Sequence, residues 1–407
     1  MSLLVFFAAY AGIALGGIPG LKLDRTGIAL LGAIAMIAVG GITLSEATAA
    51  IHAPTILLLF GLMIVSAQLR SSGFYDAAAA KLSRAVTSPH FFLLILMCAS
   101  AVLSAVLVND IICLAFTPMI AMATLRARLN PIPFLLGLAF SSNIGSAATL
   151  IGNPQNMLIG QMGGLDFGKF LGWCAVPVIL SLAVSYGMVC LIYRQQFYAA
   201  TSTEKFTSQY QLQDVVCNIQ QTRKGLLVVC LAMVFFFTSI PRELTALAAG
   251  GLLLFSRRAA SSRILGMVDW QLITLFCALF VLVAGFEKTG LPVYVMQKLN
   301  VMGCSFDDPF FLTGTSALLS NLVSNVPAVM LLTRWIQAEH QTSWYLLALT
   351  STFAGNLITI GSIANLIVIE QARAYGVVIS FREHARSGIL ITLVTLLIAI
   401  GWFRLIA

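Results

Sequence analysis

Charged side chains are scarce in this 407-residue chain, at 9% of residues, whereas a soluble globular chain is normally about a quarter charged. Hydrophobic residues make up 59%, and the mean hydropathy is +0.96. The net charge of +8 comes without a basic cluster in a polar domain, which argues against a nucleic-acid partner. We therefore expect a polytopic protein of the lipid bilayer whose loop charges set its orientation.

Catalytic and metal-binding patterns are lacking as well. The eight cysteines show no C-x-x-C spacing, and the four histidines show no metal-ligand spacing. No nucleophile–base pair or phosphate loop is present in the sequence. We therefore expect no enzyme, no cofactor and no structural metal, with the cysteines serving as small core residues.

The stretch from Ser142 to Asn156 interrupts apolar sequence with glycines, a proline and several amides. In a lipid-facing helix these residues would leave backbone groups unpaired, so this stretch must be buried or line a wet cavity. A second copy lies at 355–365, where Ile360-Gly361-x-x-x-Asn365 repeats Ile151-Gly152-x-x-x-Asn156. Broken helices of this kind form the binding sites of secondary transporters.

Two further segments repeat in register. Pro54–Phe74 pairs with Gln271–Leu291 at a shift of 217 (271 − 54), and Leu107–Asp110 pairs with Leu322–Asn325 at a shift of 215 (322 − 107). The predicted fold is an all-α polytopic membrane protein with two inverted repeats, each of five transmembrane helices, a re-entrant hairpin and a broken helix. The expected boundaries are 1–193 with a hairpin near 90–125 and a broken helix at 134–162, a cytoplasmic linker at 194–224, and 225–407 with a hairpin near 309–333 and a broken helix at 344–369.

Loop charges support this topology. With re-entrant hairpins, 17 of the 23 Lys and Arg residues fall on one side and 6 on the other. The positive-inside rule then makes the larger set cytoplasmic and both termini extracytoplasmic, in a multi-pass protein of the cytoplasmic (inner) membrane. Phe74–Thr87 has the charge and alanine content of a surface helix at the cytoplasmic interface, with a solvated loop as the alternative.

These residues resemble the ion transporter superfamily, which includes arsenite permeases, NhaD-type sodium/proton antiporters and divalent-anion/sodium symporters. Asn109-Asp110 followed by Leu114-Ala115-Phe116-Thr117-Pro118 resembles a signature of the arsenite permease branch. Thr149-Leu-Ile-Gly-Asn-Pro-Gln-Asn156 is similar to a second signature of that branch, and the 324–327 and 355–365 stretches look like their counterparts. The arsenite permease branch would imply a pump ATPase as a partner, and a homodimer is compatible with the sequence.

One departure concerns the substrate. Dicarboxylate symporters of the superfamily carry Ser-Asn-Thr at both hairpin tips, but here the triplets are Asn109-Asp110-Ile111 and Ser324-Asn325-Val326. The threonine hydroxyls expected to hold a carboxylate are missing, which argues against a dicarboxylate.

Asp110 is the one carboxylate deep in an apolar run, so it is the candidate for binding a coupling sodium ion or proton, with a helix cap as the plainer alternative. Short side chains with oxygen acceptors suit a hard cation, and a sodium ion at Asn109, Asp110 and Asn325 is one interpretation. The expected site for substrate and ion comprises Asn109, Asp110, Asn143, Thr149, Gly152, Asn153, Asn156, Ser324, Asn325, Asn356, Thr359, Gly361, Ser362 and Asn365.

The leading functional hypothesis is an ion-coupled secondary transporter of a small anion or a metalloid hydroxide, such as arsenite or antimonite, or of another inorganic or carboxylate anion. Transport would proceed by an elevator-type alternating-access movement. The alternative on the same fold is a sodium/proton antiporter in which Asp110 exchanges the two ions. An intramembrane enzyme and a channel are weaker alternatives, because catalytic motifs are absent and two repeated sites favour alternating access.

Overall fold

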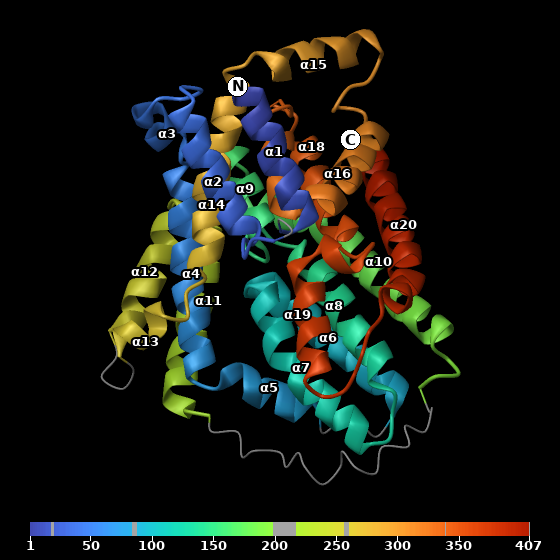
Figure 1. Ribbon diagram of the computed structural model, residues 1–407. Helices are drawn as coiled ribbons and strands as arrows, with labels where there is room; N and C mark the ends of the chain where they lie inside the picture. The colour runs from blue at the N-terminus through green and yellow to red at the C-terminus, as the bar shows by residue number, and fades with distance from the viewer. Residues whose placement is uncertain (18–19, 84–87, 198–216, 256–259, 338, 407) are drawn as a thin grey trace.

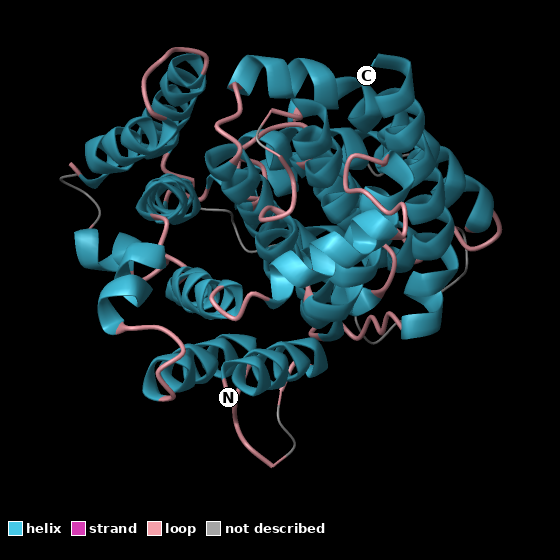
Figure 2. Ribbon diagram, turned by 90° about the horizontal axis from the view of Figure 1, so that it is seen from above, coloured by secondary structure: helices cyan, strands magenta, loops and turns pink. Residues whose placement is uncertain are grey.

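The computed structural model describes residues 1–407 except 18–19, 84–87, 198–216, 256–259, 338 and 407. The described residues form helices joined by loops, and no strand occurs among them (Figure 2). Six of the described helices have the length and apolar composition of a membrane span, and three apolar helices are shorter: α1 (Ser2–Leu15), α2 (Arg25–Ala38) and α16 (Pro309–Val323). The protein is therefore an all-helical multi-span membrane protein.

One group of helices, which we call the scaffold bundle, is built on backbone-to-backbone contact between α4 and α12. A Cβ atom on Gly61 of α4 would lie 2.5 Å from the backbone carbon of Ala246 in α12, so only glycine permits this approach. Helix α14 packs on α2, and α11 packs on α12. The bundle comprises α1, α2, α3 (Leu44–Ala50), α4 (Ala53–Ser71), α11 (Ile219–Phe236), α12 (Arg242–Leu254), α13 (Ser261–Leu265) and α14 (Trp270–Glu287).

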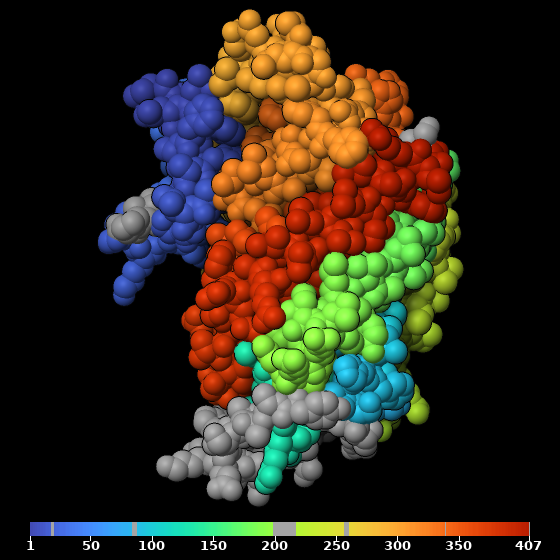
Figure 3. Space-filling view, turned by 90° about the vertical axis from the view of Figure 1, so that its right-hand side faces the viewer, coloured from blue at the N-terminus to red at the C-terminus, as the bar shows by residue number. Residues whose placement is uncertain are grey.

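A second group of helices forms the hairpin bundle, in which α6 packs on α8, α7 on α19, and α16 on α18. Helices α10 and α20 run side by side along one outer face (Figure 3). The bundle comprises α6 (Pro89–Val106), α7 (Asn109–Arg126), α8 (Pro131–Ser146), α9 (Pro154–Met162), α10 (Phe167–Ile192), α16, α17 (Asn325–Leu332), α18 (Gln341–Ala354), the 3-10 turn η1 (Thr359–Gly361), α19 (Ile363–Arg373) and α20 (Phe381–Ile406).

Both ends of the chain lie on one face, which we call the terminal face, whereas α10 ends and α11 begins near the opposite face (Figure 1). Helix α5 (Phe74–Ser83) lies at that opposite face and confirms the helical part of the predicted surface segment, although residues 84–87 lie outside the described residues. Helix α15 (Leu291–Val301) lies on the terminal face and was not expected. The 217-residue shift could have predicted it, because Leu291 aligns with Phe74 at the start of α5.

Most helix starts follow local sequence signals. Proline occupies the first turn of α4, α6, α8, α9 and α16, where its missing N–H costs no hydrogen bond. The expected linker at 194–224 ends earlier than predicted. The Asn218 side chain accepts a hydrogen bond from the Gln221 N–H, so α11 begins at Ile219 and the last linker residues are helical. Linker residues 198–216 lie outside the described residues.

Candidate functional site

Two helical hairpins, α6–α7 and α16–α17, enter the hairpin bundle from opposite faces (Figure 1). Leu107 and Val108 connect the first pair, and Ser324 alone connects the second. Ser324 has φ 76° and ψ 160°, a backbone region used almost only by glycine. The predicted approach of Asn109 and Ser324 is confirmed, because both line one cavity.

Each broken helix has an asparagine across its break. The Asn156 amide donates to the carbonyls of Ser146 (3.4 Å) and Thr149 (3.0 Å). The Asn365 amide donates to the carbonyls of Gly355 (2.8 Å) and Ile358 (3.3 Å). Both asparagines therefore satisfy carbonyl groups that the interrupted helices leave without intrahelical partners.

All three positions in these two networks are related by one shift of 209, as 365 − 156, 355 − 146 and 358 − 149 show. Two contacts between the hairpins and the broken helices also correspond, with a shift of 209 for the broken-helix residues (350 − 141) and of 216 for the hairpin residues (316 − 100). Ser141 of α8 pairs with Ser100 of α6, and Thr350 of α18 pairs with Ser316 of α16. The two halves of the chain therefore use the same contacts to attach each hairpin to its broken helix.

Glycine is required at position 152, and the corresponding position 361 has room for a Cβ atom only if the Asn321 side chain shifts. A Cβ atom on Gly152 would lie 2.2 Å from the Ser146 carbonyl oxygen, and one on Gly361 would lie 2.7 Å from Asn321 Oδ1. The Gly152 carbonyl also accepts a hydrogen bond from the Asn109 N–H at 3.3 Å, at the start of α7. Close backbone approach therefore joins the break in α8–α9 to the tip of the first hairpin.

Asn143 of α8 connects the two halves. Its amide nitrogen donates to Asn356 Oδ1 (2.8 Å) and Asn365 Oδ1 (3.2 Å). Its Oδ1 accepts from Ser362 Oγ (3.0 Å) and from the Asn109 amide (3.3 Å). Asn143 is 2% exposed, so water does not compete for these hydrogen bonds. They therefore fix the relative position of the two broken helices.

The tips and the breaks enclose a cavity of about 30 Å³, which is room for about one or two water molecules. The Asp110 carboxylate makes no hydrogen bond or ion pair with any described residue. Asn109 Oδ1 is buried without a partner, and no Lys, Arg or His from the described chain lines the cavity. The lining residues are Asn109, Asp110, Asn143, Pro154, Gln155, Leu272, Ser324, Asn325, Val326, Ser362 and Ile363.

Asn325, the repeat partner of Asp110, lines the cavity from the other hairpin. With its amide nitrogen turned toward the backbone, it donates to the carbonyls of Ser351 (3.1 Å) and Gly361 (3.3 Å). Its side chain is therefore committed to backbone groups of the second half. The two hairpin tips consequently differ, because one presents a carboxylate without a protein partner and the other a bonded amide.

The structure gathers six of the fourteen predicted site residues around the cavity: Asn109, Asp110, Asn143, Ser324, Asn325 and Ser362. Thr149 instead bonds the Ala105 carbonyl of α6, and Asn153 caps α9 by accepting from the Asn156 N–H. Asn356 is fully buried beside Asn143, and Thr359 lies in η1 and is not among the residues that line the cavity. Gly152, Asn156, Gly361 and Asn365 shape the breaks, as described above.

Three polar residues of this region were not predicted from the sequence. Gln155 lines the cavity and donates to Thr352 Oγ1 at 3.3 Å. Thr352 also accepts from the Asn153 amide, and Asn321 of α16 donates to the Ala354 carbonyl at 3.0 Å. The 209-residue shift could have identified Thr352, because it aligns with Asn143 (352 − 143).

Comparison with protein families gives a match to the model described as "Citrate transporter" (CitMHS) over residues 10–354. The chain belongs to the CitMHS family. This family lies within the ion transporter superfamily that the motifs resemble. As a CitMHS member the protein is a secondary transporter and not an enzyme.

Full-length relatives carry transporter names. The CitMHS protein is 29% identical over 420 residues to an uncharacterized transporter of Mycobacterium tuberculosis, covering 97% of this chain and 95% of that protein. It is also 29% identical over 456 residues to the silicon efflux transporter LSI3 of Oryza sativa, covering 94% and 93%. These alignments span both halves of the chain.

The fold is found in a solved structure. The CitMHS protein superposes on MtrF of Neisseria gonorrhoeae, described as illuminating a class of antimetabolite efflux pumps, with a TM-score of 0.63. The match covers 100% of this chain and 94% of MtrF at 12% sequence identity. At that identity the likeness concerns the fold alone.

Proposed function

We propose that the protein is an ion-coupled transporter of a small neutral metalloid hydroxide, with silicic acid and arsenous acid as the chemical type. The observation that carries this proposal is the cavity, which presents one carboxylate, several amides and hydroxyls, and no cationic side chain from the residues that the structure describes. A neutral hydroxide donates hydrogen bonds through its O–H groups. Asp110 and the partnerless Asn109 Oδ1 are acceptors suited to those donors.

A free carboxylate anion fits this cavity poorly. Citrate and related anions need Arg, Lys or helix N-termini to balance their charge, and the Asp110 carboxylate would repel them. Helix α9 does point its N-terminal residues Pro154 and Gln155 at the cavity, so a singly charged inorganic anion is the second choice. The name of the rice relative supports the neutral hydroxide, because dissolved silicon at neutral pH is uncharged silicic acid.

Asp110 is the residue that we propose couples transport to an ion gradient. A carboxylate in an apolar region without a protein cation beside it either takes up a proton or binds a metal cation. Asn109 and Asn325 are the neighbours that would complete a sodium site. The same oxygen-rich cavity supports the alternative function, a sodium/proton antiporter in which Asp110 binds the two ions in turn.

Movement between two end states would expose the cavity to each side. We propose that residues 1–193 and 225–407 are inverted repeats, supported by the constant 209-residue shift of the contacts around both breaks. Each repeat contributes helices to both bundles. The hairpin bundle, which holds all but one of the cavity-lining residues, would then travel as a unit against the scaffold bundle, as in an elevator.

Uptake into proteoliposomes tests the proposal. Purified protein is supplied with arsenite, silicic acid, phosphate, sulfate or citrate, with and without imposed proton or sodium gradients. We expect arsenite or silicic acid to accumulate only when a gradient is present. Asp110→Asn keeps the shape of the side chain and removes its charge, so gradient-driven uptake should fall by about tenfold or more.

Glu370→Gln is the matched control, because Glu370 is an exposed carboxylate on α19 paired only with Arg373. It should transport like the unmodified protein. Selective uptake of citrate would contradict the proposed substrate class. Unchanged pH and sodium dependence of uptake by Asp110→Asn would contradict the proposed role of Asp110. Sodium/proton exchange in the absence of any other substrate would favour the antiporter.

A further inference from the structure

The scaffold and hairpin bundles are held together by different chemistry at different depths. Arg242, the first residue of α12, donates to the carbonyl of Gly160 in the last turn of α9 (2.9 Å) and to the carbonyl of Leu165, three residues beyond that helix. The next residue, Glu243, accepts a hydrogen bond from the Gln161 amide at 3.1 Å. Two adjacent scaffold residues therefore hold one end of a single helix of the hairpin bundle.

Two further polar contacts cross between the bundles. Arg334, just after α17, pairs with Glu287 at the end of α14, with 3.3 Å between Nε and Oε1. Tyr10 of α1 donates to the carbonyl of Pro327 in α17 at 3.4 Å. Both contacts involve the second hairpin, which enters from the terminal face (Figure 1).

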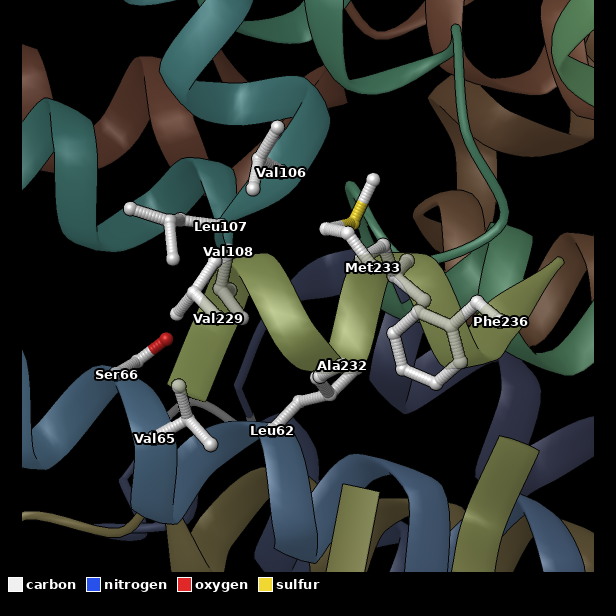
Figure 4. Close-up of a pocket in the computed structure, with 11 residues that line it drawn as sticks. Leu62, Val65, Ser66, Val106, Leu107, Val108, Val229, Ala232, Met233 and Phe236 are labelled. Carbon is white, nitrogen blue, oxygen red and sulfur yellow. The ribbon is translucent and has the colours of Figure 1, made fainter. Parts of the chain in front are cut away.

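Contact at the tip of the first hairpin is apolar instead. A crevice of about 20 Å³ separates that tip from α4 and α11, and Figure 4 shows Val108 beside Val229, with Leu107 and Val106 also in the lining. Ser66 contributes the one polar side chain in the lining. Among the described residues, no hydrogen bond joins lining residues on opposite sides of the crevice. Apolar surfaces of this kind slide without breaking directional bonds.

The structure assigns Arg242 and Glu243 as a latch that holds the hairpin bundle in the position seen here. This inference rests on the proposed movement of the two bundles. The guanidinium adds a second donor to the Gly160 carbonyl, which also accepts from the Leu165 N–H at 3.0 Å, and its charge suits the negative end of the α9 dipole. Bonds of this charged kind are stronger than neutral ones, so their loss favours release.

The latch also reaches the cavity through one short helix. Helix α9 has nine residues, with Pro154 and Gln155 at the cavity and Gly160 and Gln161 at the latch. When the hairpin bundle moves, the C-terminal end of α9 must leave Arg242. Release of the latch is therefore a required step of transport, and it involves the helix that lines the binding cavity.

Cross-linking across the apolar crevice measures the latched position. In a cysteine-free background, Val108→Cys and Val229→Cys place one thiol on each bundle within the same crevice (Figure 4). We expect Arg242→Gln to lower the rate of cross-linking by a short bifunctional reagent by about threefold or more, because two charge-assisted hydrogen bonds are lost. Arg242→Lys, which keeps the charge, should restore part of the rate.

Lys288→Gln is the matched control. It removes a cation at the terminal face whose partner, Glu46, belongs to the same scaffold bundle, so the cross-linking rate should not change. If Arg242→Gln does not yield folded protein, Gln161→Ala removes the contact to Glu243 and leaves Arg242 in place, with a smaller fall expected. An unchanged rate in the folded variant overturns the latch.

The protein with cysteines at positions 108 and 229 also distinguishes a failure of the latch from a failure of the proposed function. A protein cross-linked between positions 108 and 229 should lose uptake if the bundles move. Full uptake after complete cross-linking would overturn the movement itself. Lost uptake together with a cross-linking rate that does not respond to Arg242→Gln would leave the movement standing and overturn only the latch.

Discussion

Asn156 and Asn365 each close a helix break with two side-chain hydrogen bonds. An asparagine amide suits this task because its nitrogen carries two donors, enough for two carbonyl groups. Aspartate in the same place offers only acceptors and would leave both carbonyls unsatisfied. The amides in the apolar sequence therefore have two tasks, since some line the cavity and these two bond the carbonyl groups that the helix breaks leave without helical partners.

Gly152→Ala tests the need for close approach at the first break. The added Cβ would meet the backbone oxygens of Ser146 and Ser104 at 2.2 and 2.8 Å, neither of which can rotate away. We expect a loss of about 1–3 kcal/mol or more of stability, measured as a lower melting temperature in detergent. Gly172→Ala on α10 is the control, because nothing lies within 4 Å of its Cβ; equal melting temperatures for the two variants would contradict the tight packing.

Helix α3 is joined to the end of α14 by an exposed ion pair. Lys288 Nζ lies 2.7 Å from Glu46 Oε2, and Glu46 also completes a capping box with Thr43 at the start of α3. The hydrogen bond from Lys288, together with those from Thr43, lowers the pKa of the Glu46 carboxyl from 4.5 to about 2. The pair therefore stabilises the fold above about pH 4.5 and loses that effect as the pH falls toward 2.

Glu46→Gln should show this pH dependence. Glutamine keeps the acceptor needed for the capping box, so the substitution removes chiefly the charge. We expect a slightly lower melting temperature than that of the unmodified protein at pH 7, with the difference vanishing as the pH approaches 2. Lys288→Gln should reproduce the profile, and a difference that persists at pH 2 would rule out the ion pair as its cause.

The molecule as a whole presents a surface helix on each face. Helix α5 lies opposite the termini and α15 lies with them (Figure 1). Helix α15 exposes apolar residues, among them Val293 and Val301 at 61% and 85%, and it carries one cation, Lys298, beside Tyr294. The 17-to-6 division of Lys and Arg residues expected from the sequence leads us to propose, by the positive-inside rule, that the face of α5 is cytoplasmic.

Single cysteines at Lys298 and Lys81 test this orientation. In a cysteine-free background, Lys298→Cys on α15 should react with a membrane-impermeant maleimide in intact cells. Lys81→Cys on α5 should react only after permeabilisation, because the two helices lie on opposite faces. Labelling of Lys81→Cys in intact cells, with Lys298→Cys protected, would invert the topology.

The sequence by itself determined the class of the protein, the two hairpins and the two helix breaks. Apolar runs must become helices in lipid, and prolines, glycines and amides inside those runs can only mark breaks buried in protein. The constant spacing between repeated segments also indicated which segments of the two halves correspond. The start of α11 at Ile219 and the existence of α15 were missed, because surface helices depend on caps and packing rather than on hydrophobic length.

Only the tertiary structure decided which polar residues share a cavity. Asn143, Asn156 and Asn365 are alike in sequence, yet Asn143 joins both halves beside the cavity, while the amide nitrogens of the other two donate to backbone carbonyls. Arg242 and Glu243 appear in the sequence as an ordinary loop pair, and their contact with α9 spans about eighty residues. Local sequence specifies where a helix ends, whereas the partner of each end is set by how the two bundles pack.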